Sequence, residues 1–133
     1  EGTTLLLREQ TLNTFNDNNQ IDRQTIKTIS ERGAVTEMIT YAYTYDEYGC
    51  HIKTGIVKKQ SDKPEEIINI YHAEYLNHKQ DKPTYIFIDD YEDAITSTQR
   101  IQYDQYDRII GETIYTEGTE VRNIYTYDTL IWE

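Results

Sequence analysis

The stretch that decides the fold reads Tyr43-Thr44-Tyr45-Asp46-Glu47-Tyr48-Gly49-Cys50-His51. Tyr45 is an aromatic residue suited to the end of a strand. The side chain of Asp46 can accept a hydrogen bond from its own backbone two residues on. Gly49 stands where a type I turn is followed by a residue with positive φ, which glycine adopts freely. The stretch therefore predicts a β-hairpin.

The same pattern recurs elsewhere in the chain. It runs aromatic, Asp or Asn, two variable residues, a residue tolerant of positive φ, a polar residue and an aliphatic one. The copies begin at Phe15, Tyr45 and Tyr103, with a truncated copy at Tyr127-Asp128. The residues expected at positive φ are Asn19, Gly49 and Asp107, which all tolerate it. Ile131 falls at this position in the last copy, so Tyr127-Asp128 is expected to end a strand without a proper hairpin.

Polar and apolar residues alternate with period two between these turns, which indicates strands. One face of the strand before Asp46 carries Val35, Ile39, Tyr41, Tyr43 and Tyr45, and the other carries Thr36, Met38, Thr40, Ala42 and Thr44. A two-residue turn at Glu117-Gly118 would pair Thr116 with Thr119. It would place Ile110, Ile114, Val121, Tyr125 and Tyr127 opposite Thr113, Glu120, Arg122 and Thr126. Further strands are predicted over residues 24–30, 55–59, 85–88 and 95–103.

Residues 64–79 have two interpretations. Pro64 followed by Ile67, Ile70 and Tyr71 is compatible with an amphipathic helix. The same residues also alternate as a strand that turns near 78–83, and the neighbouring strands favour this second interpretation.

The sequence thus predicts an all-β, antiparallel meander of hairpin repeats in a single domain over residues 1–133. The sheet would be curled or would form an open barrel or a sandwich, with a helix near 64–79 as the alternative.

Composition restricts the partners. The 133 residues carry a net charge of −11, which repels the phosphates of nucleic acids and anionic lipids. The longest apolar run, Leu5-Leu6-Leu7, is far shorter than a membrane span.

Cys50 is the single cysteine, so no intramolecular disulfide forms. The start at Glu1-Gly2 is interpreted as that of a processed product from which a leader was removed.

The string Tyr43-Thr44-Tyr45-Asp46-Glu47-Tyr48-Gly49 resembles the YD repeat of RHS-type bacterial surface and toxin-shell proteins. Small exported proteins of gut Bacteroidetes with degenerate YD-like repeats are similar in size. The resemblance implies an antiparallel meander, a secreted, periplasmic or cell-surface location, and a binding or scaffolding role. It carries over no catalytic residue. His51 departs from the pattern, which has an aliphatic residue at this position.

The sequence favours none of three other chemical sites. The acidic cluster Asp89–Asp93 has calcium-type ligands but lacks the spacing of an EF-hand. A zinc site would need Cys50, His51, His72 and His78 to converge, and their spacing does not favour this. A glycosidase needs two carboxylates across a cleft, but among 24 acidic residues some pair always has that separation, so the count does not indicate such a site. No cofactor or metal is therefore predicted.

The candidate ligand-binding residues are Tyr41, Tyr43, Tyr45, Tyr125 and Tyr127. A row of tyrosines that faces water would form a platform for sugar rings or an extended peptide. The alternative is that these rows belong to the core. The apolar C-terminal run could form an edge strand that adds to another sheet, or Trp132 could plug the end of a barrel.

Three functional hypotheses follow. The first is a non-enzymatic secreted or envelope-associated module that binds a glycan or protein through a sheet face. The second is an acidic, immunity-type partner that masks a basic toxin, steered by the charge of −11. The third is a carboxylate-dependent hydrolase, which requires a cleft with a buried Asp or Glu.

Overall fold

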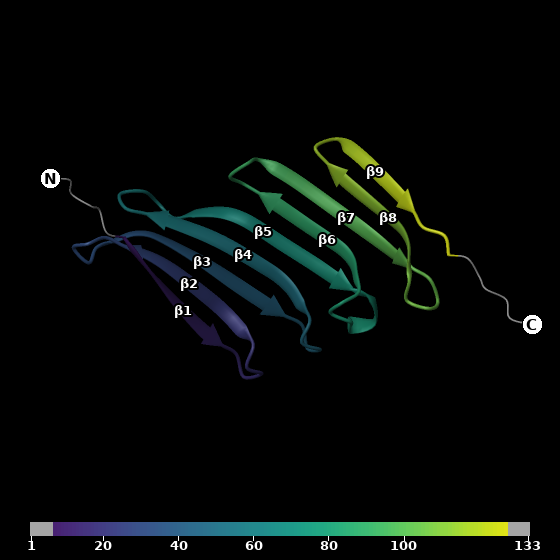
Figure 1. Cartoon of the computed structure of the whole chain (residues 1–133), viewed down its shortest axis with the longest axis horizontal. Coiled ribbons are helices and arrows are strands. Elements are labelled where there is room, and N and C mark those ends of the chain that lie inside the picture. The colour runs from purple at the N-terminus through teal and green to yellow at the C-terminus, as the bar shows by residue number, and fades with distance from the viewer. Residues whose placement is uncertain (1–6, 128–133) are drawn as a thin grey trace, which may run out of the picture.

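The computed structural model describes residues 7–127, which form nine strands in one antiparallel sheet (Figure 1). In chain order the strands are β1 (Arg8–Phe15), β2 (Ile21–Ile29), β3 (Val35–Tyr45), β4 (His51–Gln60), β5 (Glu66–Tyr75), β6 (Pro83–Asp90), β7 (Ile95–Tyr103), β8 (Ile109–Thr116) and β9 (Thr119–Ile124). Each strand pairs with its sequence neighbours, so the fold is a β-meander, as predicted. Because β1 and β9 do not pair, the described sheet is an open layer rather than a barrel or sandwich.

Residues 66–75 form β5, so the strand interpretation of 64–79 is confirmed and the helix alternative is wrong. β5 pairs with β4 through Thr54↔Tyr71 and with β6 through Ala73↔Ile86. A helix here would leave the facing backbone groups of β4 and β6 without partners, which is costly. The only helical residues described are the short 3-10 turn Leu76–His78.

The aromatic–Asp turns share one hydrogen-bond pattern. The Asp46 carboxylate accepts hydrogen bonds from the backbone N–H groups of Tyr48 and Cys50, both at 2.9 Å. Asn16 and Asp104 accept the equivalent bonds in their own turns. The φ angles of Asn19, Gly49 and Asp107 are 61°, 85° and 62°, as the repeat pattern predicts. Side-chain chemistry at the first turn residue therefore fixes each hairpin.

The β8–β9 hairpin also closes as predicted. Glu117 and Gly118 have φ angles of 50° and 80°, the left-handed pair expected of a type I′ turn. Thr116 pairs with Thr119 and Ile114 with Val121. β9 ends at Ile124, so Tyr125 and Tyr127 follow the strand rather than lying within it, while Asp128, Ile131 and Trp132 fall outside the described residues.

A tyrosine at the C-terminal end of an odd-numbered strand, or shortly after it in the case of β9, bonds to the first residue of the even-numbered strand before it. The Tyr45 hydroxyl, at the end of β3, donates to the carbonyl of Ile21, the first residue of β2, at 2.8 Å. The same bond recurs from Tyr75 to His51, from Tyr103 to Pro83 and from Tyr127 to Ile109, at 2.5, 2.7 and 2.6 Å. We call these four bonds the tyrosine clamps. Each clamp closes the open end of one hairpin.

Neighbouring turns at the clamped end of the sheet also contact one another. Gln20 Nε2 donates to the Gly49 carbonyl at 3.0 Å, and the Cys50 thiol donates to the His78 carbonyl at 3.0 Å. Lys79 Nζ lies 2.6 Å from Asp107 Oδ2. These contacts join successive hairpins at their turns, beyond the backbone ladder.

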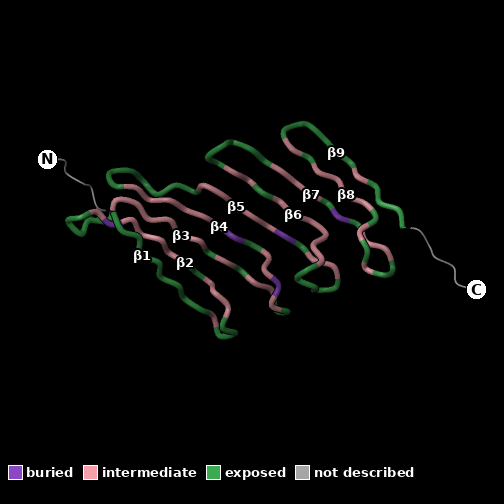
Figure 2. Tube along the Cα trace, in the orientation of Figure 1, coloured by how far each residue is buried: buried purple, intermediate pink, exposed green. Residues whose placement is uncertain are grey.

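The sheet has almost no interior (Figure 2). Among residues 7–127, the buried ones are Ile29, Cys50, Thr54, Ala73 and Ile101. A single layer cannot enclose side chains on either face, so most apolar residues are only half-buried. Stability must therefore depend strongly on hydrogen bonds and on contacts between neighbouring side chains within each face.

We expect Tyr45→Phe and Tyr103→Phe each to lower the free energy of unfolding by about 1 kcal/mol, because each removes one clamp hydrogen bond and little else. Urea unfolding measures the change. Tyr106→Phe is the control, because its side chain is 69% exposed and makes no hydroxyl hydrogen bond among the described residues. Equal losses in all three variants would contradict a structural role for the clamps.

Candidate binding faces of the sheet

The register divides the strand residues between two faces. We call the first the tyrosine face; at its centre lie Tyr41, Tyr43, Ile56, Thr54 and Tyr71. We call the other the basic face; it carries Arg23, Lys27, Lys53, Lys59, Arg100 and Arg122. The two faces lie on opposite sides of one layer, so a ligand on one does not contact the other.

An aromatic cluster occupies the tyrosine face over β3–β5. The rings of Tyr41 and Tyr43 are stacked with centroids 6.3 Å apart. The His51 ring is parallel to that of Tyr71 at 5.3 Å and meets Tyr43 edge-on at 5.7 Å. The rings therefore form one continuous aromatic surface across three strands.

The tyrosines of this cluster are half-buried, so the row is neither a closed core nor a freely exposed platform. Burial raises the pKa of Tyr43, and the neighbouring Tyr41 and Tyr45 raise it further. The Tyr45 hydroxyl is engaged in a clamp. Among residues 7–127, the hydroxyls of Tyr41 and Tyr43 have no hydrogen-bond partner, so they remain available to a ligand.

The structure does not bring Tyr125 and Tyr127 together with the tyrosines of β3. Tyr125 follows β9 and is bonded through its N–H to the Ile110 carbonyl at the far edge of the sheet. Six strand spacings separate it from β3, or roughly 30 Å. The Tyr127 hydroxyl is used in a clamp, and its ring lies beneath the Arg108 guanidinium at 4.4 Å. Tyr41 and Tyr43 therefore form the stronger candidate, with Tyr125 and Tyr127 as a separate patch.

The His51 ring packs against both Tyr43 and Tyr71 in the aromatic cluster. Its Nε2 lies 3.1 Å from the Lys53 carbonyl oxygen and contacts Thr54 Oγ1. Desolvation by burial lowers the pKa of His51, although the bond to the Lys53 carbonyl opposes the shift. The lowered pKa favours the neutral form of His51, so its ring stacks on Tyr71 without burying a charge.

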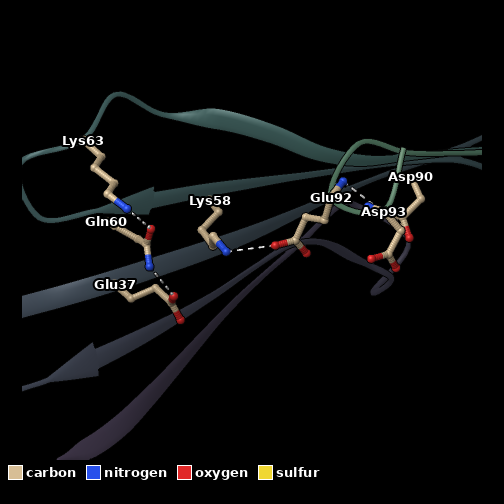
Figure 3. A network of polar contacts seen from close by, with 7 residues as sticks. All are labelled: Glu37, Lys58, Gln60, Lys63, Asp90, Glu92 and Asp93. Atoms are coloured by element: carbon tan, nitrogen blue, oxygen red, sulfur yellow. Dashed lines mark hydrogen bonds and ion pairs between the residues drawn. The ribbon is translucent and has the colours of Figure 1, made fainter. Parts of the chain in front are cut away.

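One ion pair and several hydrogen bonds occupy the acidic cluster near the other end of the tyrosine face (Figure 3). Glu92 reaches Lys58 of β4 at 2.9 Å. Asp90 accepts hydrogen bonds from the N–H groups of Glu92 and Asp93, at 3.0 and 3.2 Å. These carboxylates therefore shape a turn. No group of three or more His, Cys, Asp or Glu residues within 7–127 could hold a metal ion.

The histidines and Cys50 are likewise separated. Cys50 contacts the backbone carbonyl of His78 rather than its ring. His72 lies on the basic face beside Glu74, whereas His51 lies on the tyrosine face. Burial raises the pKa of the Cys50 thiol, and Asp46 adds to the shift, which disfavours a reactive thiolate.

Two further observations concern buried carboxylates and membrane-spanning helices. Thr54 is the only buried polar residue within 7–127, so these residues contain no buried Asp or Glu of the kind that a hydrolase cleft needs. None of the described helical segments has the length and apolar character needed to cross a bilayer.

Sequence reasoning missed His51 and Tyr71 as members of the aromatic cluster, and it missed the clamps. Tyr71 was hidden in the ambiguous segment 64–79. The clamp at Tyr75 was hidden because Leu76 stands where the other copies have Asp or Asn. The nearly even spacing of Phe15, Tyr45, Tyr75, Tyr103 and Tyr127 was the signal that could have revealed it.

No protein-family model matches the chain, and no curated protein sequence matches it significantly. The resemblance to YD-repeat proteins therefore stays a prediction.

We expect the stability of the protein to fall as the pH drops below about 6.5, partly through His51. Its folded-state pKa lies below the ordinary 6.5, so the unfolded chain binds the proton first and acid favours unfolding. The His51→Phe variant keeps the stacked ring but cannot titrate. Its urea-unfolding free energy should depend less on pH between 7 and 5.5 than that of the native protein. His72→Gln is the control, and an identical pH profile for His51→Phe and the native protein would refute the role of His51.

Proposed function

We propose that the chain is a non-enzymatic binding or scaffold module, acting outside the cell or in the cell envelope, that recognises a glycan or protein through a face of its sheet. The observation that carries this proposal is the single layer itself. Nothing within residues 7–127 covers either face, and only five of these residues are buried. A protein that devotes so little of its surface to a core has two large faces available for partners.

The aromatic cluster supports recognition by the tyrosine face. Tyr41, Tyr43 and Tyr71 offer apolar ring surface, and the first two have hydroxyls free of partners among residues 7–127. Sugar rings bind aromatic faces through their C–H groups while their hydroxyls form hydrogen bonds, and protein partners use tyrosine in the same two ways. Because the clamps and the stacked rings hold the cluster in place, binding would cost little ordering entropy.

A second candidate function, masking of a basic toxin by an acidic partner, is favoured by the positions of the carboxylates. The turns at the two ends of the sheet carry Asp17, Asp46, Glu47, Asp62, Asp81, Glu92, Asp93, Asp104, Asp107 and Glu117. Acidic residues in exposed turns would raise the rate of encounter with a basic protein, and salt would weaken this effect.

A thermal-shift panel of soluble polysaccharides and peptidoglycan fragments tests the first proposal. A ligand at a hundred times its Kd stabilises a folded protein by about 2.7 kcal/mol, which is several degrees for a domain of this size. For a ligand that shifts the melting temperature, we expect Tyr41→Ala and Tyr43→Ala to weaken binding by roughly tenfold, which titration calorimetry measures.

Tyr115→Ala is the matched control, because Tyr115 is 48% exposed and lies on the opposite face. If Tyr115→Ala abolishes binding while Tyr41→Ala and Tyr43→Ala retain it, the tyrosine face is not the binding site. A flat panel would reject the glycan form of the proposal.

A further inference from the structure

The basic face carries an unusual concentration of positive charge for a chain of net charge −11. Over β2 and β4 it presents Arg23, Lys27, Lys53 and Lys59. None of them forms an ion pair with a residue in 7–127. Lys59 instead donates to the backbone carbonyls of Gln60 and Lys63. Because these positive side chains have no carboxylate partners among the described residues, this part of the surface has a positive potential that attracts anions.

Three of these cations line a shallow trough, and Lys53 lies near it, two residues from Gly55 on the same face of β4. Lys27 and Lys59 lie in one row across the sheet with Met38 between them, about 10 Å apart at two strand spacings. Arg23 and Lys53 lie on the other side, toward the clamped end. A depression of about 420 Å³ lies between the two pairs, and its lining includes Arg23, Thr25, Thr40, Ala42, Gly55 and Val57.

The trough continues beyond Met38. A second depression of about 320 Å³ is lined by Lys27, Met38 and Lys59 together with the turn residues Gln60 and Ser61. Small residues form much of the floor, and a side chain added at Gly55 would meet nothing within 4 Å. Two carboxylates lie close by: Glu65 lines the first depression, and Asp22, the neighbour of Arg23 in β2, accepts a hydrogen bond from Thr14.

The chemistry of the trough favours one class of polyanion. Over β1–β4 the basic face presents no aromatic ring, whereas proteins that bind single-stranded nucleic acid stack bases on aromatic side chains. Protein interfaces likewise depend on buried aromatic anchors. The floor instead offers the hydroxyls of Thr25 and Thr40 between the cations. A wide duplex would also reach the acidic turns at the ends of the strands.

We propose that the trough on the basic face over β2–β4 binds an extended anionic polysaccharide, whose carboxylate or sulfate groups pair with Arg23, Lys27, Lys53 and Lys59 while its hydroxyls bond to the threonines of the floor. This site lies on the opposite side of the sheet from the aromatic cluster. It goes beyond the proposed function, because it adds a second surface with a ligand class of its own.

Dextran sulfate and neutral dextran are the probes, because they share a backbone and differ in charge. The variants Lys27→Gln/Lys59→Gln and Arg23→Gln/Lys53→Gln should each weaken binding of dextran sulfate by roughly tenfold. Glu65→Gln should tighten it, because this variant removes a carboxylate from the trough. The control Lys58→Gln/Lys79→Gln loses the same charge from the tyrosine face and from a turn, and its affinity should stay within about twofold of the native value.

Arg23 and Lys53 are exposed and make no side-chain hydrogen bond within residues 7–127, so their variant tests the site even if Lys59→Gln disturbs the fold. Equal binding of neutral dextran would overturn the proposal, as would equal weakening in the control. Binding of polyglutamate or a single-stranded oligonucleotide as tight as that of dextran sulfate would overturn the assignment to a glycan. Retained binding of dextran sulfate in Tyr41→Ala and Tyr43→Ala would support the site independently of the proposed function.

Discussion

The hydrogen bond from a tyrosine at or shortly after the end of a strand to the first carbonyl of the preceding strand is the interaction on which the rest of this structure depends. It recurs at Tyr45, Tyr75, Tyr103 and Tyr127. At each of these places the backbone ladder of a hairpin ends, and the tyrosine hydroxyl adds one further bond between its two strands. In a layered protein, packing against a second layer would hold them together. Here the phenol provides both an apolar ring for the face and a hydroxyl for the backbone, so one residue type serves both needs.

The clamps account for four of the tyrosines in the chain. Thirteen of the 133 residues are tyrosines, compared with two phenylalanines. Phenylalanine would supply the same ring area but would leave the Ile21 or Pro83 carbonyl without its partner. Burial raises the pKa of Tyr75, together with the influence of Tyr71, to about 12, so the hydroxyl stays protonated and able to donate well above neutral pH. Phe15, which ends β1, has no preceding strand within the described residues to fasten.

A single layer has a consequence for function, because the two faces can carry different chemistry. Adjacent strand residues point to opposite sides, so Lys58 meets Glu92 on the tyrosine face while Lys59 lies on the basic face. In a two-layer protein one of these faces would be committed to the core. Here the aromatic cluster around Tyr43 and the cations around Lys27 both remain at the surface, and the acidic turns lie at the ends of the strands.

The sequence by itself determined the local structure. The turns at Asn16, Asp46 and Asp104, the positive φ of Asn19, Gly49 and Asp107, and the pairing of Thr116 with Thr119 all follow from residue types a few positions apart. It also identified the all-β meander and the shared face of Tyr41, Tyr43 and Tyr45. Only the tertiary structure decided that the sheet stays a single open layer, because alternation looks the same whether a face is covered or not. It also decided that Tyr71 and His51 join Tyr43 and that Arg23, Lys27 and Lys59 line one trough, because the register between strands places those residues together from distant parts of the chain.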